Sequence, residues 1–308
     1  MDLTLKQLSY FLALTRTRHF GRAAQETFVT QPALSTQIRE LEDRIGATLI
    51  DRSSRAFRLT PAGQEVRAAA FRIMGEVERI KTTARWQNGL QGHLKLGIIP
   101  TVAPYVLPEF LPDLRMRDVT LDLSLTEAKT ERILTLLMDG EIDAALIALP
   151  SGAPGLIEEP LFQDRFFLAN RRAEHGAAQG QPARPAPSDL NPETLLLLDE
   201  GHCLADQALA VCGMRRSATK VDLRASSLPT LCGLVAAGFG QTLLPEIALP
   251  AETAAAPNLE ITRFCAPEPA RTIGLVRRDL GGPDGWFMDL AMLLKRAAAR
   301  LKTHAVPS

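Results

Sequence analysis

The chain has 308 residues, of which 46% are hydrophobic and 23% charged, so it is long enough for two or three globular domains. Lys plus Arg and Asp plus Glu both number 35, and this balance favours neither a nucleic-acid nor a membrane partner. Residues 1–90 nevertheless carry 14 basic and nine acidic side chains. This excess suits contact with phosphates, although a solvated helical surface would also account for it.

The sequence has no hydrophobic run near the roughly 18 residues that span a bilayer, and residues 1–20 lack the apolar core of a signal peptide. We therefore expect a cytoplasmic protein without a membrane partner. The four cysteines, Cys203, Cys212, Cys232 and Cys265, are too few for the disulfide framework of a secreted protein. In a reducing compartment, any disulfide among them would be a regulated one.

The first 60 residues predict a winged helix-turn-helix. Residues 4–16 and 21–26 have the apolar spacing of helices, and a third helix begins near Thr30, whose hydroxyl can cap it. One face of this third helix is apolar and packs inward, while short polar groups and an arginine lie elsewhere on it. The residues that we expect to contact DNA from this helix are Thr30, Gln31, Pro32, Ser35, Thr36 and Arg39.

Residues 49–59 predict a basic hairpin that forms the wing. Arg52, Arg55 and Arg58 lie along it, where they can bind phosphates. Any one of them alone could equally be an ordinary surface arginine, but three beside a helix-turn-helix favour DNA contact.

A long helix follows from Thr60-Pro61 to about residue 88, which corresponds to about 40 Å at the usual rise. Apolar residues recur along it with a heptad spacing, which favours a two-helix dimer seam over packing on its own domain. The predicted seam consists of Val66, Ala70, Ile73, Val77, Ile80 and Ala84. Gly89 and Gly92 end the helix.

Beyond His93, short β-branched or leucine-rich runs alternate with helical stretches, which predicts an α/β domain of two lobes with a cleft between them. Residues 173–187, rich in Ala, Gly, Gln and Pro, read as a solvated loop. The expected strands are 94–99, 121–125, 144–149, 166–169, 195–198, 220–224, 241–244 and 272–276.

Several N-terminal motifs occur together: residues 20–26 (FGRAAQE), 31–42 (QPALSTQIRELE), 59–63 (LTPAG), Gly46 and Arg52. Together they resemble the signature of LysR-type transcription regulators. The resemblance implies a DNA-binding domain over 1–60, a linker and dimerisation helix over 61–90, and an effector domain over 91–308 that is similar to periplasmic binding proteins. It also implies double-stranded promoter DNA as partner, a dimer that assembles to a tetramer, and contact with RNA polymerase.

Residues 199–212 carry the most unusual chemistry of the effector domain. Gly201 turns the chain after a leucine run, and Cys203 is expected in the first turn of the next helix, where the helix N-terminus and His202 favour a reactive thiolate. If the segment is helical, Cys203 and Cys212 lie about 13 Å apart, whereas a disulfide needs Cα atoms within about 7 Å. Bonding the two cysteines therefore requires the helix to unwind. Taken alone, both cysteines could instead be small buried apolar residues, which is the commonest role of free cysteine.

The whole effector domain is similar to that of the hydrogen-peroxide-sensing members of the LysR family. The motifs are residues 99–105 (IPTVAPY), 127–130 (EAKT), 199–212, 235–238 (VAAG), 243–245 (LLP) and 268–275 (EPARTIGL). The resemblance implies that Cys203 reacts with peroxide and that Cys212 then forms a disulfide with it, which activates oxidative-stress genes. It further implies a peroxide pocket formed by Thr101, Thr130, His202, Asp206 and Arg271.

Other readings stay open at this point. A LysR-type regulator that binds a small organic ligand in its cleft would not use Cys203, and a thiol peroxidase would need turnover, which a DNA-reading domain argues against. The spacing of Cys203 and Cys212 is not that of a zinc site, so we expect no metal. We also expect no other cofactor, and we expect that the protein is not an enzyme. Cys232 and Cys265 receive no role.

Overall fold

The computed structural model describes residues 3–51, 57–85, 90, 92–172, 184–201, 203–214, 225–280 and 284–304. The chain divides into two compact units, Met1–Ala84 and Arg85–Ser308. Each unit contains a hydrophobic core of its own.

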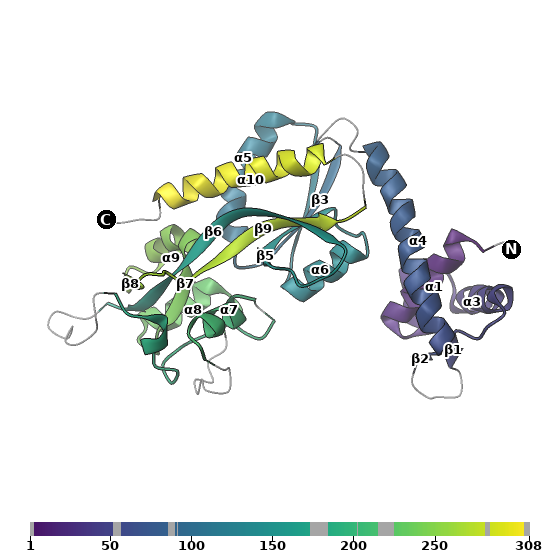
Figure 1. The fold of residues 1–308 in the computed structure, drawn as a ribbon, viewed down its shortest axis with the longest axis horizontal. Helices are drawn as coiled ribbons and strands as arrows, with labels where there is room; N and C mark the ends of the chain where they lie inside the picture. The colour runs from purple at the N-terminus through teal and green to yellow at the C-terminus, as the bar shows by residue number, and fades with distance from the viewer. Residues whose placement is uncertain are drawn as a thin grey trace. The chain divides into compact units, whose positions relative to one another are not determined.

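The first unit is a helix-turn-helix followed by a small hairpin and a long helix (Figure 1). Its third helix begins where the sequence predicts, because the Thr30 hydroxyl accepts a hydrogen bond from the Ala33 amide, and it ends at Gly46 in the left-handed conformation. Leu34, Ile38 and Leu41 on this helix are fully buried. The elements are α1 (Leu5–Thr17), α2 (Phe20–Glu26), α3 (Gln31–Ile45), β1 (Ile50–Asp51), β2 (Arg58–Leu59) and α4 (Pro61–Arg85).

The predicted wing is confirmed as an antiparallel pair in which Ile50 lies opposite Leu59. A buried carboxylate on α3 holds it: Glu42 Oε1 accepts from the amides of Leu49 at 2.8 Å and Ile50 at 3.2 Å. These bonds join α3 directly to the first strand of the wing, so they fix the position of the predicted wing against the helix. Arg58 is exposed, whereas Arg52 and Arg55 lie outside the described residues.

Helix α4 places the residues of the predicted dimer seam in two different environments. Ala70 is 1% exposed and Val66 packs beside it against the core of the first unit. Farther along, Ile73 is 43% and Ile80 is 68% exposed, with Val77 half-buried. The side chain of Ala84 and residues 86–89 lie outside the part that the structure describes.

The second unit is built on a seven-stranded mixed sheet with the order β4-β3-β5-β9-β6-β7, and β8 also pairs with β6. β3 runs parallel to β4 and β5, whereas β9 is antiparallel to β5 and β6. The strands are β3 (His93–Ile98), β4 (Asp122–Glu127), β5 (Ala144–Leu149), β6 (Leu156–Arg171), β7 (Thr242–Pro245), β8 (Leu259–Arg263) and β9 (Ala270–Arg278).

The long strand β6 connects two lobes (Figure 1). Its first half pairs with β9 beside the β3-β4-β5 group, which we call lobe 1, and its second half pairs with β7 and β8, which belong to lobe 2. Lobe 1 carries α5 and α6, and lobe 2 carries α7, α8 and α9, while α10 packs along α5. The helices are α5 (Ala103–Arg117), α6 (Thr130–Met138), α7 (Cys203–Val211), α8 (Leu228–Ala236), α9 (Leu249–Ala255) and α10 (Gly285–His304), with short 3-10 turns η1 (Pro187–Asp189) and η3 (Glu246–Ala248).

Two strand predictions for this unit were wrong. Residues 195–198 form no strand, because Leu195 and Leu198 make only isolated bridges to Gln241 and Ala225. The strand expected at 166–169 starts much earlier, at Leu156, and β8 was not predicted. The strand expected at 220–224 and most of the loop expected at 173–187 lie outside the described residues.

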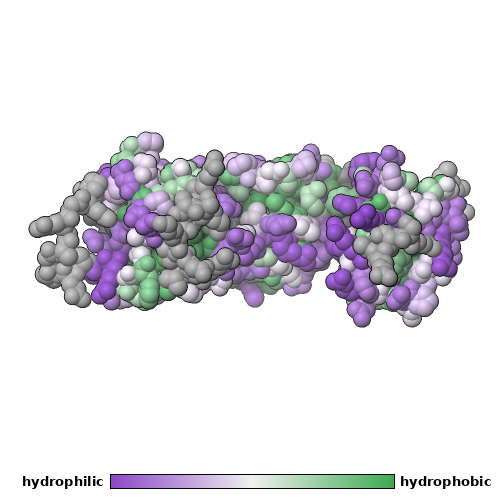
Figure 2. Space-filling model, turned by 90° about the horizontal axis from the view of Figure 1, so that it is seen from below, coloured by the Kyte–Doolittle hydropathy of each residue, from purple (hydrophilic) through white to green (hydrophobic). Residues whose placement is uncertain are grey.

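The surface is mixed in character. Figure 2 shows hydrophilic side chains over much of the visible face, with hydrophobic ones in small groups between them. Within the described ranges, no helix is both long and apolar enough to cross a membrane.

Candidate functional site: two thiols on one helix and a buried arginine network

Cys203 and Cys212 lie at the two ends of α7. Cys203 is the first residue of the helix, as predicted, and follows a turn in which Gly201 has a φ of +85°. Its side chain is half-buried. Cys212 directly follows the helix, is 5% exposed, and its amide still donates to the Ala208 carbonyl at 3.1 Å. Both thiols are free. Because the helix between them is intact, its length of about 13 Å keeps the thiols too far apart to bond.

Burial determines the chemistry of Cys212. The loss of solvent around this thiol raises its pKa from 9.0 to about 11. Since the thiolate is the nucleophile, Cys212 is unreactive while α7 keeps it buried. Of the two cysteines, the half-buried Cys203 is the one that solvent and small molecules can reach.

Arg271 lies at the centre of a buried network that contains Thr101. Its Nη1 donates to the Thr101 hydroxyl at 2.9 Å and its Nη2 to the Thr101 carbonyl at 3.1 Å. Arg271 is 3% and Thr101 2% exposed. Two residues of the predicted peroxide pocket are thus in direct contact, and the arginine fixes both the backbone and the side chain of Thr101.

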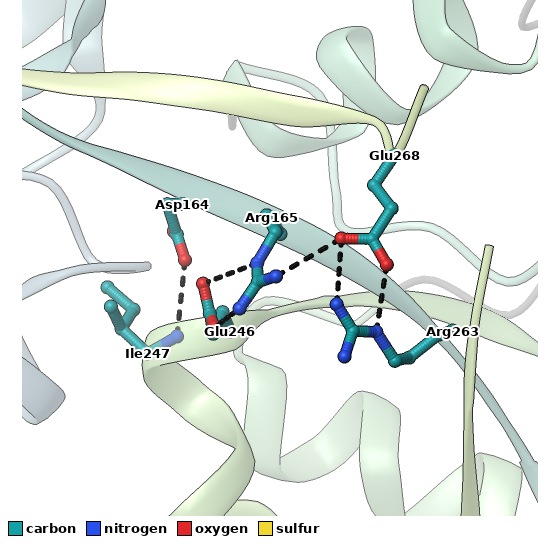
Figure 3. Close-up of polar contacts among 6 residues, drawn as sticks. All are labelled: Asp164, Arg165, Glu246, Ile247, Arg263 and Glu268. Carbon is teal, nitrogen blue, oxygen red and sulfur yellow. Dashed lines mark hydrogen bonds and ion pairs between the residues drawn. The ribbon is translucent and has the colours of Figure 1, made fainter. Parts of the chain in front are cut away.

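Asp164 is the third member of this network and was not predicted from the sequence. It lies opposite Arg271 in the β6–β9 pairing and accepts from Arg271 Nε at 2.9 Å. Its other oxygen accepts from the Ile247 amide at 3.1 Å, a contact drawn in Figure 3. Complete burial raises the pKa of Asp164, and the opposing effect of Arg271 does not cancel it. The contact with Arg271 Nε still gives the guanidinium an acidic partner inside the protein.

A second chain of charged groups lies next to Asp164 (Figure 3). Arg165 donates to the fully buried Glu246 and, at 3.2 Å, to Glu268, which also accepts from Arg263 Nε at 2.8 Å. Because Glu246 opens η3 and Asp164 binds the amide of Ile247 in the same turn, η3 is held to β6 at two adjacent positions. This gives Arg271 a rigid support.

Three buried side-chain oxygens in the described part of lobes 1 and 2 have no hydrogen-bond partner: Thr130 Oγ1, Asp199 Oδ1 and Gln207 Oε1. Thr130 opens α6, Asp199 precedes the turn at Gly201, and Gln207 lies on α7. Buried polar atoms of this kind are commonly satisfied by water or by a polar ligand. Thr130 was predicted, whereas Asp199 and Gln207 were missed, although both lie in the 199–212 motif.

The remaining predicted pocket residues are placed differently. Asp206 is exposed on α7, and His202 lies outside the described residues. Cys232, which received no role, is 1% exposed on α8 and lies beside Glu252; burial, together with Glu252, raises the pKa of its thiol. Glu252 also accepts from the buried Tyr105 hydroxyl at 2.7 Å, which joins α9 of lobe 2 to α5 of lobe 1.

The predicted DNA-contacting residues form one exposed surface on α3. Gln31, Pro32, Thr36 and Arg39 are exposed and Ser35 is half-buried. Thr30 caps the helix with its hydroxyl. Over the same described ranges of both units, His, Cys, Asp and Glu side chains form no group of three arranged to hold a metal ion.

Comparison with known proteins matches both units. The family described as "Bacterial regulatory helix-turn-helix protein, lysR family" matches residues 5–64, and the "LysR substrate binding domain" matches residues 87–284. The chain is 41% identical to the "Probable hydrogen peroxide-inducible genes activator" of Streptomyces viridosporus, covering 98% of this chain and 97% of that protein. It is 40% identical to the "DNA-binding transcriptional dual regulator OxyR" of Escherichia coli K12, covering 90% of each.

A solved structure of Corynebacterium glutamicum OxyR, a cysteine-to-serine mutant with hydrogen peroxide bound, is also similar. It is 38% identical, the match covers 99% of this chain and 95% of that one, and the TM-score is 0.66.

Proposed function

Since this chain belongs to the LysR family of DNA-binding transcription regulators, we propose that it activates oxidative-stress genes when hydrogen peroxide oxidises Cys203. The single observation that carries the proposal is the arrangement on α7, with an accessible thiol at the helix start and a buried thiol just beyond its end. The relatives named for hydrogen peroxide support it.

The first step is attack of the Cys203 thiolate on one peroxide oxygen. A sulfur–oxygen bond forms as the oxygen–oxygen bond breaks, which leaves sulfenic acid on Cys203 and releases hydroxide. The Thr101 hydroxyl accepts from Arg271 and can still donate its hydrogen to a peroxide oxygen, and the unpartnered Thr130 hydroxyl can donate or accept. We assign these residues, with His202, Asp206 and Arg271, to the peroxide pocket.

The second step joins the two cysteines. The Cys212 sulfur displaces hydroxide from the sulfenic acid, and this hydroxide combines with the thiol proton, so two thiols and one peroxide yield a disulfide and two waters. For this step α7 must unwind and Cys212 must leave its buried position. Oxidation is thereby converted into a change of shape in lobe 2.

The signal would be read at DNA by the first unit. We assign promoter binding to residues 1–60, with α3 in the major groove and Arg52, Arg55 and Arg58 on phosphates, and dimerisation to residues 61–90. Ile73 and Ile80, which are exposed in the single chain, support a partner helix along α4. We further propose a tetramer of two dimers, contact with RNA polymerase, and a cytoplasmic location.

One observation favours a second candidate, regulation by a small organic ligand. A pocket of about 310 Å³ lies beside β6 and β7, at the lower end of the usual range for ligand sites. Its lining combines apolar and polar groups: Leu168, Pro185, Asp189, Leu190, Asn191, Thr194 and Gln241. A ligand there would not require Cys203, so Cys203→Ser would leave induction intact.

Disulfide mapping tests the main proposal. Reduced protein is treated with micromolar peroxide and analysed by mass spectrometry, with Cys265→Ser as a matched control at another half-buried cysteine. We expect a Cys203–Cys212 bond in the parent and in the control. Footprints on promoter DNA should differ between the two redox states. Absence of the bond after peroxide treatment would contradict the proposal.

A further inference from the structure

Lys129 joins lobe 1 to the turn that precedes Cys203. It lies immediately before α6, and its Nζ donates to the backbone carbonyl of Glu200 at 2.5 Å. Its stem lies against Gly201, where a Cβ atom would come within 3.0 Å of Lys129 Cδ. One side chain therefore makes both a polar and an apolar contact with the same turn.

This turn determines how the chain enters α7. Gly201 has a φ of +85°, a conformation that other residues adopt with difficulty, and the lysine stem occupies the space that a side chain there would need. Thr130, the next residue after Lys129, has a buried hydroxyl without a hydrogen-bond partner in the part of the chain that the structure describes. Lys129 thus sets the start of α6, with Thr130, against the turn that presents Cys203.

We propose that Lys129 is a positioning residue for the thiol reaction, which holds the Glu200–Gly201 turn in the reduced protein and releases it when Cys203 bonds to Cys212. The inference rests on the proposed function, because only disulfide formation requires α7 to unwind next to this turn. A cationic donor suits the role, since it binds a carbonyl strongly yet exchanges readily with water at a half-exposed site.

A contact that exists only in the reduced protein stabilises the dithiol relative to the disulfide. Its removal should therefore make the disulfide form more readily and be harder to reduce. The same change should slow the first step, because Cys203 is then presented less uniformly to peroxide. The first effect favours the disulfide at equilibrium, and the second slows the reaction with peroxide. An equilibrium titration and a rate measurement therefore distinguish them.

The test uses the full-length chain with Lys129→Met, which keeps the stem and removes the donor. Titration in dithiothreitol redox buffers gives the potential of the Cys203–Cys212 couple. We expect a fivefold shift of the equilibrium towards the disulfide, which is about 20 mV more negative at roughly 30 mV per tenfold. In a Cys212→Ser background, we expect sulfenic acid to form about fivefold more slowly.

Two further variants make the result specific. Lys129→Arg keeps a cationic donor and should restore most of the parent's potential. Lys295→Met removes an exposed lysine of α10, whose Nζ lies 2.6 Å from Glu159 Oε1 on β6, and should change neither quantity. A Lys129→Met potential equal to that of the parent would overturn the positioning role alone. A parent protein that forms no Cys203–Cys212 bond would overturn the proposed function, and the role of Lys129 with it.

Discussion

Arg271 and Asp164 face each other across paired strands, and the guanidinium Nε donates to the carboxylate at 2.9 Å where the two side chains are 1% and 0% exposed. The pair also connects the lobes, because Arg271 binds Thr101 in lobe 1 and Asp164 binds the amide of Ile247 in η3. A single buried ion pair thus shapes the proposed peroxide pocket and, together with the Arg165–Glu246 pair, anchors η3.

Breaking this pair should destabilise the protein strongly. Arg271→Met leaves Asp164 buried without its cation, which we expect to lower the free energy of unfolding by about 3–5 kcal/mol. Urea unfolding of the reduced protein measures the change. As a control, Arg117→Met removes a partner from the half-exposed ion pair with Asp289 and should cost less than about 1 kcal/mol. Equal losses of unfolding free energy in the two variants would show that the buried pair stabilises the fold no more than the half-exposed pair does.

Substitutions of the two threonines in the proposed pocket should differ in their effects on protein stability and on the oxidation rate of Cys203. Thr130→Val removes a hydroxyl that has no hydrogen-bond partner among the described residues, so stability should not fall, whereas peroxide oxidation of Cys203 should slow by about tenfold or more. Thr101→Val removes a hydroxyl bonded to Arg271 and should lower the unfolding free energy by about 1–3 kcal/mol in addition to slowing oxidation. Stopped-flow oxidation and urea unfolding distinguish the variants. An unchanged oxidation rate in Thr130→Val would remove this residue from the pocket.

Burial of Cys212 should give the reduced protein a distinct alkaline weakness. Its pKa is raised from 9.0 to about 11 in the folded protein, so the unfolded chain loses this proton first and stability falls as the pH rises through that window. Unfolding free energies of the parent and of Cys212→Ala, measured at several pH values across it, should converge as the pH increases. A constant difference between the two proteins would show that Cys212 keeps an ordinary pKa.

The exposed surface of α3 should carry DNA affinity without affecting the fold. We expect Arg39→Ala to weaken promoter binding by about tenfold and to reduce the dependence of binding on salt, because one cation fewer meets the DNA. Arg115→Ala, at an exposed arginine on α5, serves as the control and should bind normally. Gel-shift titrations at several salt concentrations provide the measurement, and unaltered affinity in Arg39→Ala and in Ser35→Ala would refute the recognition-helix assignment.

The exposed part of α4 should hold the dimer together. Ile80 is 68% exposed, and Ile80→Glu would place a charge in the proposed seam, so we expect dissociation to monomers at concentrations where the parent is dimeric. Sedimentation velocity reports the change. Arg67→Glu alters the charge at an exposed position of the same helix outside the heptad pattern and should leave assembly intact. Dimers of normal strength in Ile80→Glu would mean that another surface joins the chains.

The helices of the first unit and the start of α7 could be predicted because their signals are local. Thr30 caps α3 through its own hydroxyl, Gly46 supplies the left-handed end, and Gly201 provides the turn before Cys203. Each of these features depends on neighbours a few residues away. The periodic apolar pattern then determines which face is buried.

The parts that could not be predicted depend on distant partners. Asp164 is an acidic residue in a strand, which reads as a solvent-facing position until Arg271 is found opposite it in the register. Residues 195–198 are apolar enough for a strand but obtain only single bridges, because a neighbouring chain segment must supply the hydrogen bonds. The predicted seam on α4 is another example, because Ala70 is buried in the core of the first unit whereas Ile80 is exposed. The heptad spacing alone does not distinguish these two environments.

The continuity of β6 has a consequence for resetting. The strand keeps its hydrogen bonds to β9, β7 and β8 through residues that lie outside the segment 199–214, so unwinding of α7 would leave this framework paired. The segment can then return to the same docking surface once the disulfide is reduced, without the rest of the chain folding again. The protein should therefore keep its fold through repeated cycles of oxidation and reduction.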